Sequence, residues 1–239
     1  MISASTLLLV LVIVAYVART EVGVDYSQLT SVSSLSCAHD YGYNFAIPRV
    51  YMSTGQPDPN GPANINNAWS AGMTHVDGYI FPCFSCGNAA GQMDATIDYL
   101  ASHSLYLTGS TEAKAMGAGV NGTNSALKAT IGMLWVDVEG TQYWSSNQQS
   151  NVNFIAEMIN EGVARGVSIG IYTSSSQWSP ITGGSTQFSS YPLWFANWDA
   201  NWSACTSTFT PFGGWTSAAM KQYVGDESFC SAGFDKNCW

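Results

Sequence analysis

The sequence is poor in charged residues, and above all in positive charge. Of its 239 residues only 7 are Lys or Arg and 3 are His, against 16 Asp or Glu, which gives a net charge of −9. Binding to a phosphate backbone depends on Lys and Arg, so we expect no nucleic-acid partner. The same negative charge repels anionic surfaces at neutral pH and less so in acid. We therefore expect an acidic working compartment, such as a gut lumen or a digestive vacuole.

Long hydrophobic runs are also absent after the first segment of the chain. Residues 6–17 form an apolar run of about a dozen residues, the length of a signal-peptide core. Spanning a bilayer takes about 20 residues, so a membrane anchor is the less favoured alternative. We expect residues 1–20 to be a signal peptide with an approximate cleavage point. The mature protein is then secreted or lies in the lumen of digestive or lysosome-like vesicles, with no membrane contact.

The rest of the chain, residues 21–239, shows no internal repeat, linker or low-complexity tract. About 220 residues suit one large domain, and we expect that domain to be monomeric. Two N-x-S/T sequons, at Asn121 and Asn201, are candidate glycosylation sites on surface loops.

Cysteine is present in an even number behind the expected signal peptide, which predicts three disulfides. Six cysteines allow 15 pairings, and the sequence does not choose among them. Cys83 and Cys86 are also spaced like a redox motif or a metal knuckle, but a metal site needs a second close pair or nearby histidines. We therefore expect a structural disulfide here, no metal and no cofactor. The six positions are Cys37, Cys83, Cys86, Cys205, Cys230 and Cys238.

Short apolar strands alternate with helical or irregular connections along the chain. The segment 133–138 is apolar except for Asp137, which is typical of a strand buried on both faces of a parallel sheet. The helix predicted at 151–165 and the strand at 167–172 complete a βαβ unit. Another helix is predicted at 92–103, and 105–119 is ambiguous. The other predicted strands are residues 22–26, 45–52, 76–81, 193–196, 220–224 and a short segment at Phe234.

This pattern predicts an α/β fold, an irregular (β/α) barrel of about eight mostly parallel strands with some outer helices missing. Val152, Ile155, Ile159 and Val163 are expected to line the buried face of the helix at 151–165. Active sites of such barrels lie at the carboxyl ends of the strands. Functional side chains should therefore fall where predicted strands end.

Four acids meet that condition: Asp25, Asp137, Glu139 and Asp235. Asp137 and Glu139 are two residues apart on a strand, so their side chains share one face, with Cα atoms about 6.7 Å apart. Two carboxyls this close repel as anions, which raises the pKa of one of them. A neutral acid beside an ionised one is what glycosidic bond cleavage needs. The alternative is that both acids merely solvate a strand end before Gly140.

Six short segments occur in a specific order. They are GVDYSQ at residues 23–28, WVDVEG at 135–140, GIYTS at 170–174, LWFAN at 193–197, KQY at 221–223 and GFDKN at 233–237. In this order they resemble glycoside hydrolase family 25, the Chalaropsis-type lysozymes, and are similar to its nematode and amoebal members. The resemblance covers essentially all of the chain after residue 20.

The resemblance implies a β/α barrel that acts as a muramidase on the glycan strands of bacterial peptidoglycan. It implies Glu139 as the general acid, with Asp137 orienting the N-acetyl group of the substrate or stabilising charge. Asp25 and Asp235 would hold this pair and tune its pKa values. Substrate-assisted and direct-water mechanisms both stay open, as do roles in digestion and in antibacterial defence.

Aromatic residues at predicted strand ends are candidates for stacking on sugar rings, with core packing as the alternative. They are Tyr79, Tyr172, Trp194 and Tyr223. The sequence departs from the family in two places. Many members carry Tyr-His-Phe where this chain has Tyr79-Ile80-Phe81, and the loop with Cys83 and Cys86 is not general to the family.

Two other functions remain as alternatives. A chitinase of glycoside hydrolase family 18 would show the pattern D-x-x-D-x-D-x-E, but here Gly132 and Trp135 replace its first two acids. A catalytically weak or inactive wall-binding immune effector would usually lose a catalytic acid, and all four acids are present.

Overall fold

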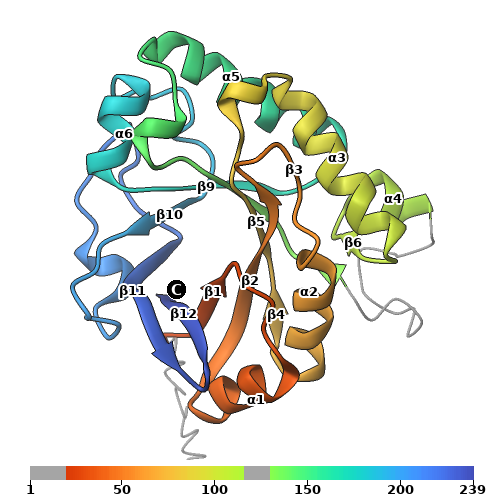
Figure 1. The fold of residues 1–239 in the computed structure, drawn as a ribbon. Coiled ribbons are helices and arrows are strands. Elements are labelled where there is room, and N and C mark those ends of the chain that lie inside the picture. The colour runs from red at the N-terminus through yellow and green to blue at the C-terminus, as the bar shows by residue number, and fades with distance from the viewer. Residues whose placement is uncertain (1–19, 116–129) are drawn as a thin grey trace, which may run out of the picture.

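Eight strands close into a barrel in the computed structural model of the protein, which describes residues 20–115 and 130–239 (Figure 1). The barrel closes because β1 pairs with β2 on one side and with β12 on the other. Its strands, in order around the barrel, are β1 (Val22–Tyr26), β12 (Ala232–Cys238), β11 (Met220–Phe229), β10 (Leu193–Ala196), β9 (Ile169–Thr173), β8 (Leu134–Asp137), β5 (Gly78–Ile80) and β2 (Tyr43–Met52). Neighbours are parallel except that β12 is antiparallel to both β11 and β1.

Helices cover only part of the barrel (Figure 1). They are α1 (Val32–Asp40), α2 (Gly61–Ser70), α3 (Ala89–Ser102), α4 (Thr111–Ala115), α5 (Gln148–Ala164) and α6 (Ser175–Thr182). Within residues 130–239, the connection from β10 to β11 carries only the short helix η3 (Cys205–Thr208), and β11 leads into β12 by a hairpin. The predicted irregular barrel with missing outer helices is therefore confirmed.

Four minor strands lie outside this ring. β3 (Gln56–Pro57) and β4 (His75–Val76) both pair with β2. β6 (Tyr106–Leu107) and β7 (Thr130–Ile131) form a separate parallel pair. The ambiguous segment 105–119 thus contains β6 and α4 in its described part.

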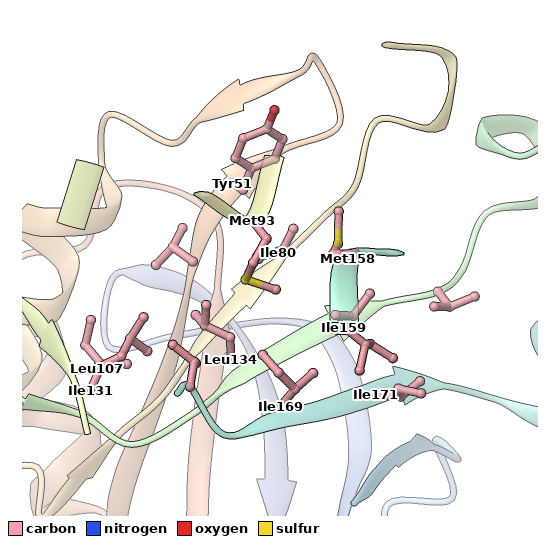
Figure 2. Close-up of a cluster of buried hydrophobic side chains, with 14 of the residues drawn as sticks. Tyr51, Ile80, Met93, Leu107, Ile131, Leu134, Met158, Ile159, Ile169 and Ile171 are labelled. Atoms are coloured by element: carbon pink, nitrogen blue, oxygen red, sulfur yellow. The ribbon is translucent and has the colours of Figure 1, made fainter. Parts of the chain in front are cut away.

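The core has two layers. Inside the barrel, Phe45, Ile47, Trp135, Tyr172, Trp194 and Met220 form one cluster of buried side chains. The second, larger cluster fills the space between the strands and the helices. Figure 2 shows part of it, where Ile80, Leu134 and Ile169 of the strands meet Met93 of α3 and Met158 and Ile159 of α5.

The predicted buried face of α5 is wrong at one residue. Val152, Ile155 and Ile159 are buried as predicted, but Val163 is 52% exposed. The close approach to β9 is made instead by Gly162, where an added Cβ would lie 2.6 Å from Ile169 Cδ1. Because Gly162 faces the sheet, its neighbour Val163 turns toward solvent.

The carboxyl-terminal strands are longer than the sequence indicates. The strand predicted at 220–224 continues to Phe229, and the short segment at Phe234 is the seven-residue strand β12. Cys230 and Ser231 have positive φ angles, 52° and 61°, in the turn between the two strands. This part of the hairpin is polar and partly exposed, so it lacks the apolar alternation that predicts a strand.

Three disulfides are formed, as predicted: Cys37–Cys230, Cys83–Cys86 and Cys205–Cys238. The first ties α1 to the β11–β12 turn, and the last ties η3 to the end of β12. The expected signal peptide, apart from its last residue, and the sequon at Asn121 lie outside the described residues. In the described part of the chain, no helix is long and apolar enough to cross a membrane.

Candidate active site

A cavity of about 220 Å³ opens at the mouth of the barrel, where the parallel strands end. It brings together all four acids and three of the four aromatic residues that the sequence analysis singled out. Its lining consists of Asp25, Ser27, Arg49, Tyr79, Phe81, Asp137, Glu139, Tyr172, Trp194, Gln222 and Asp235. A second hollow of about 270 Å³ shares Asp25, Ser27, Tyr79 and Asp235 and extends toward the β11–β12 turn.

Asp137 is the last residue of β8 and is 4% exposed. Its atom Oδ1 is buried and has no hydrogen-bond partner among the described residues. Val138, the next residue, points to the layer between strands and helices, so Asp137 and Glu139 share the face that lines the cavity. Such an unpaired buried oxygen is costly in a folded protein, and it marks a place for a ligand donor.

Glu139 lies just beyond the end of β8 and is half-buried. Its backbone is held from two sides, because Trp144 Nε1 donates to the Glu139 carbonyl oxygen at 2.9 Å and Gly140 N donates to Gln177 Oε1 at 2.9 Å. Burial raises the pKa of the Glu139 carboxyl, and the nearby charges of Asp235 and Asp226 raise it further. This carboxyl is therefore suited to donate a proton in mildly acidic solution.

The other carboxyls have similarly shifted pKa values for related reasons. Burial raises the pKa of Asp25 and of Asp137 well above the usual value, and the neighbouring acids Asp235 and Glu139 add to this effect. Arg49 opposes the shift at Asp137, although its guanidinium is already paired with the buried Asp58 at 2.7 Å. The four carboxyls therefore influence the pKa values of one another and do not titrate independently.

Asp235 lines the cavity, but from a different position on its strand than the sequence predicts. It is not at a strand end but lies inside β12, opposite Asp25 in the register. Because β12 is antiparallel to its neighbours, its first half faces the mouth of the barrel. The Asp235 carboxyl accepts hydrogen bonds from the Asp226 backbone N at 2.6 Å and from Gln222 Nε2 at 3.2 Å.

Tyr223 is not brought to the cavity. It is 5% exposed and packs with the Cys205–Cys238 disulfide on the other face of β11. The adjacent Gln222 points into the barrel instead and donates to Asp25 Oδ2 at 3.0 Å. It also accepts from the Tyr172 hydroxyl at 2.8 Å.

Sequence reasoning missed Gln222, Asn237 and Arg49 as site residues. Asn237 donates to Asp25 Oδ2 at 2.7 Å and accepts from Trp194 Nε1 at 2.9 Å. Gln222 and Asn237 stand in the segments KQY and GFDKN that carried the family resemblance. The two-residue strand period could have assigned Gln222, rather than Tyr223, to the inner face.

The arrangement is suited to acid–base chemistry on a ligand that enters the mouth of the barrel. Residues 20–115 and 130–239 contain no group of three or more His, Cys, Asp or Glu side chains placed to hold a metal ion. The carboxyls line the cavity together with Tyr79, Tyr172 and Trp194, which form its aromatic wall.

Comparison with known proteins identifies the family. A family model described as Lysozyme-like protein 1 matches residues 17–111 and 104–223. The chain is 41% identical over 215 residues to probable GH family 25 lysozyme 2 of Dictyostelium discoideum, covering 90% of this chain and 89% of that protein. It is 33% identical to Lysozyme-like protein 5 of Caenorhabditis elegans, covering 90% and 88% of the two chains.

Solved structures show the same fold at lower identity. The family GH25 lysozyme from Aspergillus fumigatus superposes with a TM-score of 0.67 at 20% identity, over 92% of this chain and 94% of that one. A muramidase from Trichobolus zukalii gives a TM-score of 0.66 at 22% identity, over 91% and 92% of the two chains. With the barrel and its acids in place, the chain belongs to the lysozymes of glycoside hydrolase family 25.

Proposed function

We propose that the protein is a muramidase that hydrolyses the β-1,4 bond following N-acetylmuramic acid in the glycan strands of bacterial peptidoglycan. Relatives named lysozymes, the resemblance in fold to muramidases and the acid-lined cavity support this substrate. The observation that carries the proposal is the pairing of an unpartnered buried oxygen, Asp137 Oδ1, with the half-buried carboxyl of Glu139 in one cavity.

In the proposed mechanism, Glu139 protonates the oxygen of the leaving sugar. The raised pKa of its carboxyl keeps the proton available in mildly acidic solution. Protonation of that oxygen lets the glycosidic bond break, and the bonding electrons stay with the leaving sugar. A water molecule supplies the hydroxyl group at the other sugar, and Glu139 takes the proton from that water in the second half of the reaction.

Asp137 acts on the sugar that remains. Its free Oδ1 can accept a hydrogen bond from the acetamido N–H of the substrate, whereas Asp25 Oδ2 is already held by Gln222 and Asn237. Orienting the acetamido group in this way directs its carbonyl oxygen toward the sugar carbon, where it replaces the leaving oxygen before water enters. Besides burial, the charge of Asp25 raises the pKa of Asp137 and the charge of Asp235 raises the pKa of Glu139, while Gln222 holds Asp25 and Asp235 in place.

We also propose that the protein works outside the cell or in the lumen of a digestive or lysosome-like vesicle, in bacterial digestion or antibacterial defence. Three disulfides are typical of oxidising compartments, and the apolar run near the amino terminus is typical of a signal peptide. Detection of the processed, disulfide-bonded protein in secreted or vesicle fractions would test this part. Finding it only in the cytosol with free thiols would contradict it.

The function is tested by digesting purified peptidoglycan and identifying the new reducing ends. The proposal expects muramic acid at those ends, and glucosamine would show that the other β-1,4 bond is cut. Glu139→Gln should release no new ends while still binding the walls. The matched control is Glu157→Gln, an exposed position on α5 with the same change of charge, which should keep full activity. Full activity in Glu139→Gln would overturn the mechanism.

A further inference from the structure

A separate pocket of about 320 Å³ lies beside the catalytic cavity, between the loops that follow β5 and β8. We call it the disulfide-loop pocket, because Cys83 and its neighbours form one wall. Phe84 and Ser85 stand on that wall, and Gln142, Tyr143 and Trp144 stand on the opposite one. The pocket and the cavity are adjacent, since Phe81 of the cavity contacts Tyr143 of the pocket with ring centroids 5.1 Å apart.

The first wall of this pocket is rigid. The Cys83–Cys86 disulfide closes the loop, and the buried side chain of Gln92 on α3 holds it from below. Gln92 accepts from Cys83 N at 3.0 Å and donates to the carbonyl oxygens of Cys83 at 2.8 Å and Gly87 at 2.7 Å. A loop held in this way pays little ordering entropy when a ligand binds.

The opposite wall is tied to the catalytic acid. Trp144 donates its indole N–H to the Glu139 carbonyl oxygen, and its ring packs with Phe84 and Phe154 at centroid distances of 6.1 Å. Gly140, with φ of +65°, allows the turn that brings Tyr143 back over the loop, because a Cβ there would lie 2.7 Å from the tyrosine ring. Tyr143 itself is 46% exposed, so its ring is available to a ligand.

The position of the pocket suits a polymer. The hollow at the β11–β12 turn is lined mainly by residues of β1, β11 and β12, whereas the disulfide-loop pocket is lined by residues that follow β2, β5 and β8. The catalytic cavity shares four residues with the hollow and adjoins the pocket at Phe81, while the hollow and the pocket have no residue in common. A linear substrate that crosses the mouth through the cavity extends past Glu139 into the disulfide-loop pocket.

The chemistry of the lining favours a neutral sugar. Among the described residues that line it, none is charged, and the polar groups are hydroxyls and one amide alongside aromatic rings. Aromatic faces and neutral hydrogen-bonding groups fit a pyranose ring, whereas the stem peptides of peptidoglycan carry charges that find no partner here. We propose that the disulfide-loop pocket binds an uncharged N-acetylhexosamine unit of the glycan strand, beyond the bond that is cleaved.

This proposal rests on the proposed function for its substrate, but it can be tested by binding alone. The probe is a ladder of peptidoglycan glycan oligomers of increasing length with their stem peptides removed. Binding is measured by calorimetry on the Glu139→Gln protein, which does not consume the probe. The proposal expects affinity to increase by one final step when the oligomer reaches the pocket. Adding Tyr143→Ala should remove that step, a loss of about tenfold in affinity.

Two further variants control for loss of folding. Tyr41→Ala removes another exposed tyrosine, 75% accessible and located just before β2 at the opposite end of the barrel, and should keep the whole ladder. The double change Cys83→Ser and Cys86→Ser frees the loop and should weaken the same final step while shorter oligomers bind as before.

The outcomes separate the pocket from the enzyme activity. An unchanged ladder in Tyr143→Ala overturns the pocket, whatever the hydrolysis assay shows, and so does a final step that appears only when stem peptides are attached. If the native protein releases no reducing ends but Tyr143→Ala still loses the step, the pocket stands and the proposed function fails.

Discussion

Gln222 donates a hydrogen bond to Asp25, with 3.0 Å between Nε2 and Oδ2, and the same nitrogen lies 3.2 Å from Asp235 Oδ2. One neutral amide thus joins the buried Asp25 of β1 to the half-buried Asp235 of β12. Its carbonyl oxygen accepts from Tyr172 and from Trp198, each at 2.8 Å. The orientation of this amide is fixed by its four partners, and through it the two acids keep their places beside Asp137 and Glu139.

Replacing Gln222 should therefore impair catalysis in two distinguishable ways. Gln222→Met removes the hydrogen bonds but keeps the volume, and because hydrogen bonds to charged groups contribute about 1.5–3 kcal/mol, we expect kcat/KM to fall about 10- to 100-fold at every pH. Gln222→Glu adds a carboxyl that repels both acids when ionised, so its activity should recover as the pH falls. Equal losses for both variants across the pH range would mean that Gln222 only fills space.

The pH range in which the protein is active should depend on the charge of Asp226. Glu139 must be protonated to act as the acid, so activity should fall as the pH rises through its raised pKa, and the optimum should lie below neutrality. The charge of Asp226 contributes to that raised pKa. Asp226→Asn should then move the alkaline limb of the kcat/KM profile to lower pH, and less so in high salt, because exposed charges are screened.

Asn suits this position because Asp226 has a positive φ of 56° and Asn tolerates that region. The hydrogen bond from its backbone N to Asp235 is kept. Glu157→Gln, with the same change of charge on the exposed face of α5, should leave the profile in place. An optimum above pH 7 in the native protein, or no shift in Asp226→Asn, would contradict this account.

The raised pKa of Asp137 should make the stability of the protein depend on pH. Its folded-state pKa is raised well above the usual value, first by burial, so the folded protein holds this proton more tightly than the unfolded chain. Below the unfolded pKa of about 3.9 both states are protonated and Asp137 carries no penalty. Above it, stability is lost as the pH rises through the folded pKa.

Asp137→Asn removes that titration. We expect the variant to melt near the native temperature at about pH 3.5 and above it at pH 7, with about 2–4 °C for each kcal/mol gained. The measurement is calorimetric melting across this pH range, and the variant should be inactive throughout. If the melting difference were the same at both pH values, the buried carboxyl would carry no ionisation penalty.

The sequence predicted those parts of the fold that have strong local patterns. The apolar strand at β8 and the helix α5 follow from periodicity, and the acids of β1 and β8 follow from strand ends. Helices α1, α2 and α6 were not predicted, because they are rich in Ser or Asn and α6 contains Pro180. Their stability comes from packing on the barrel and from caps such as Ser174, which accepts from Gln177 N.

Site residues could be predicted where the periodicity of a single strand places them. They were harder to predict where pairing with a distant strand brings them to the cavity. Asp137 and Glu139 needed only the two-residue period. Asp235 reaches the cavity because β12 reverses direction, and nothing in its neighbours indicates that reversal. The contact of Asn237 with Asp25 joins residues 212 positions apart, a pairing that appears only when β1 and β12 close the barrel.

The two disulfides that link distant parts of the chain should differ in how much they stabilise the fold. Cys37–Cys230 closes a loop with a sequence separation of 193 residues, and Cys205–Cys238 one of 33. The chain-entropy relation gives upper values of about 5 and about 4 kcal/mol for these two links. We therefore expect Cys37→Ala with Cys230→Ala to lower the free energy of unfolding more than Cys205→Ala with Cys238→Ala, as measured by urea denaturation.

Wall lysis at 25 °C should survive loss of the Cys37–Cys230 link, because α1 and the β11–β12 turn lie outside the acid-lined cavity. Loss of Cys205–Cys238 should cost less stability than loss of Cys37–Cys230, but we expect it to lower activity more. That link anchors η3, and the loop before η3 carries Asp199, whose carboxylate oxygens pair with the buried Lys221 at 2.7 Å beside Gln222 on β11. If Cys37→Ala with Cys230→Ala proved less destabilising than Cys205→Ala with Cys238→Ala, packing in the folded state rather than loop length would set the contribution of each disulfide.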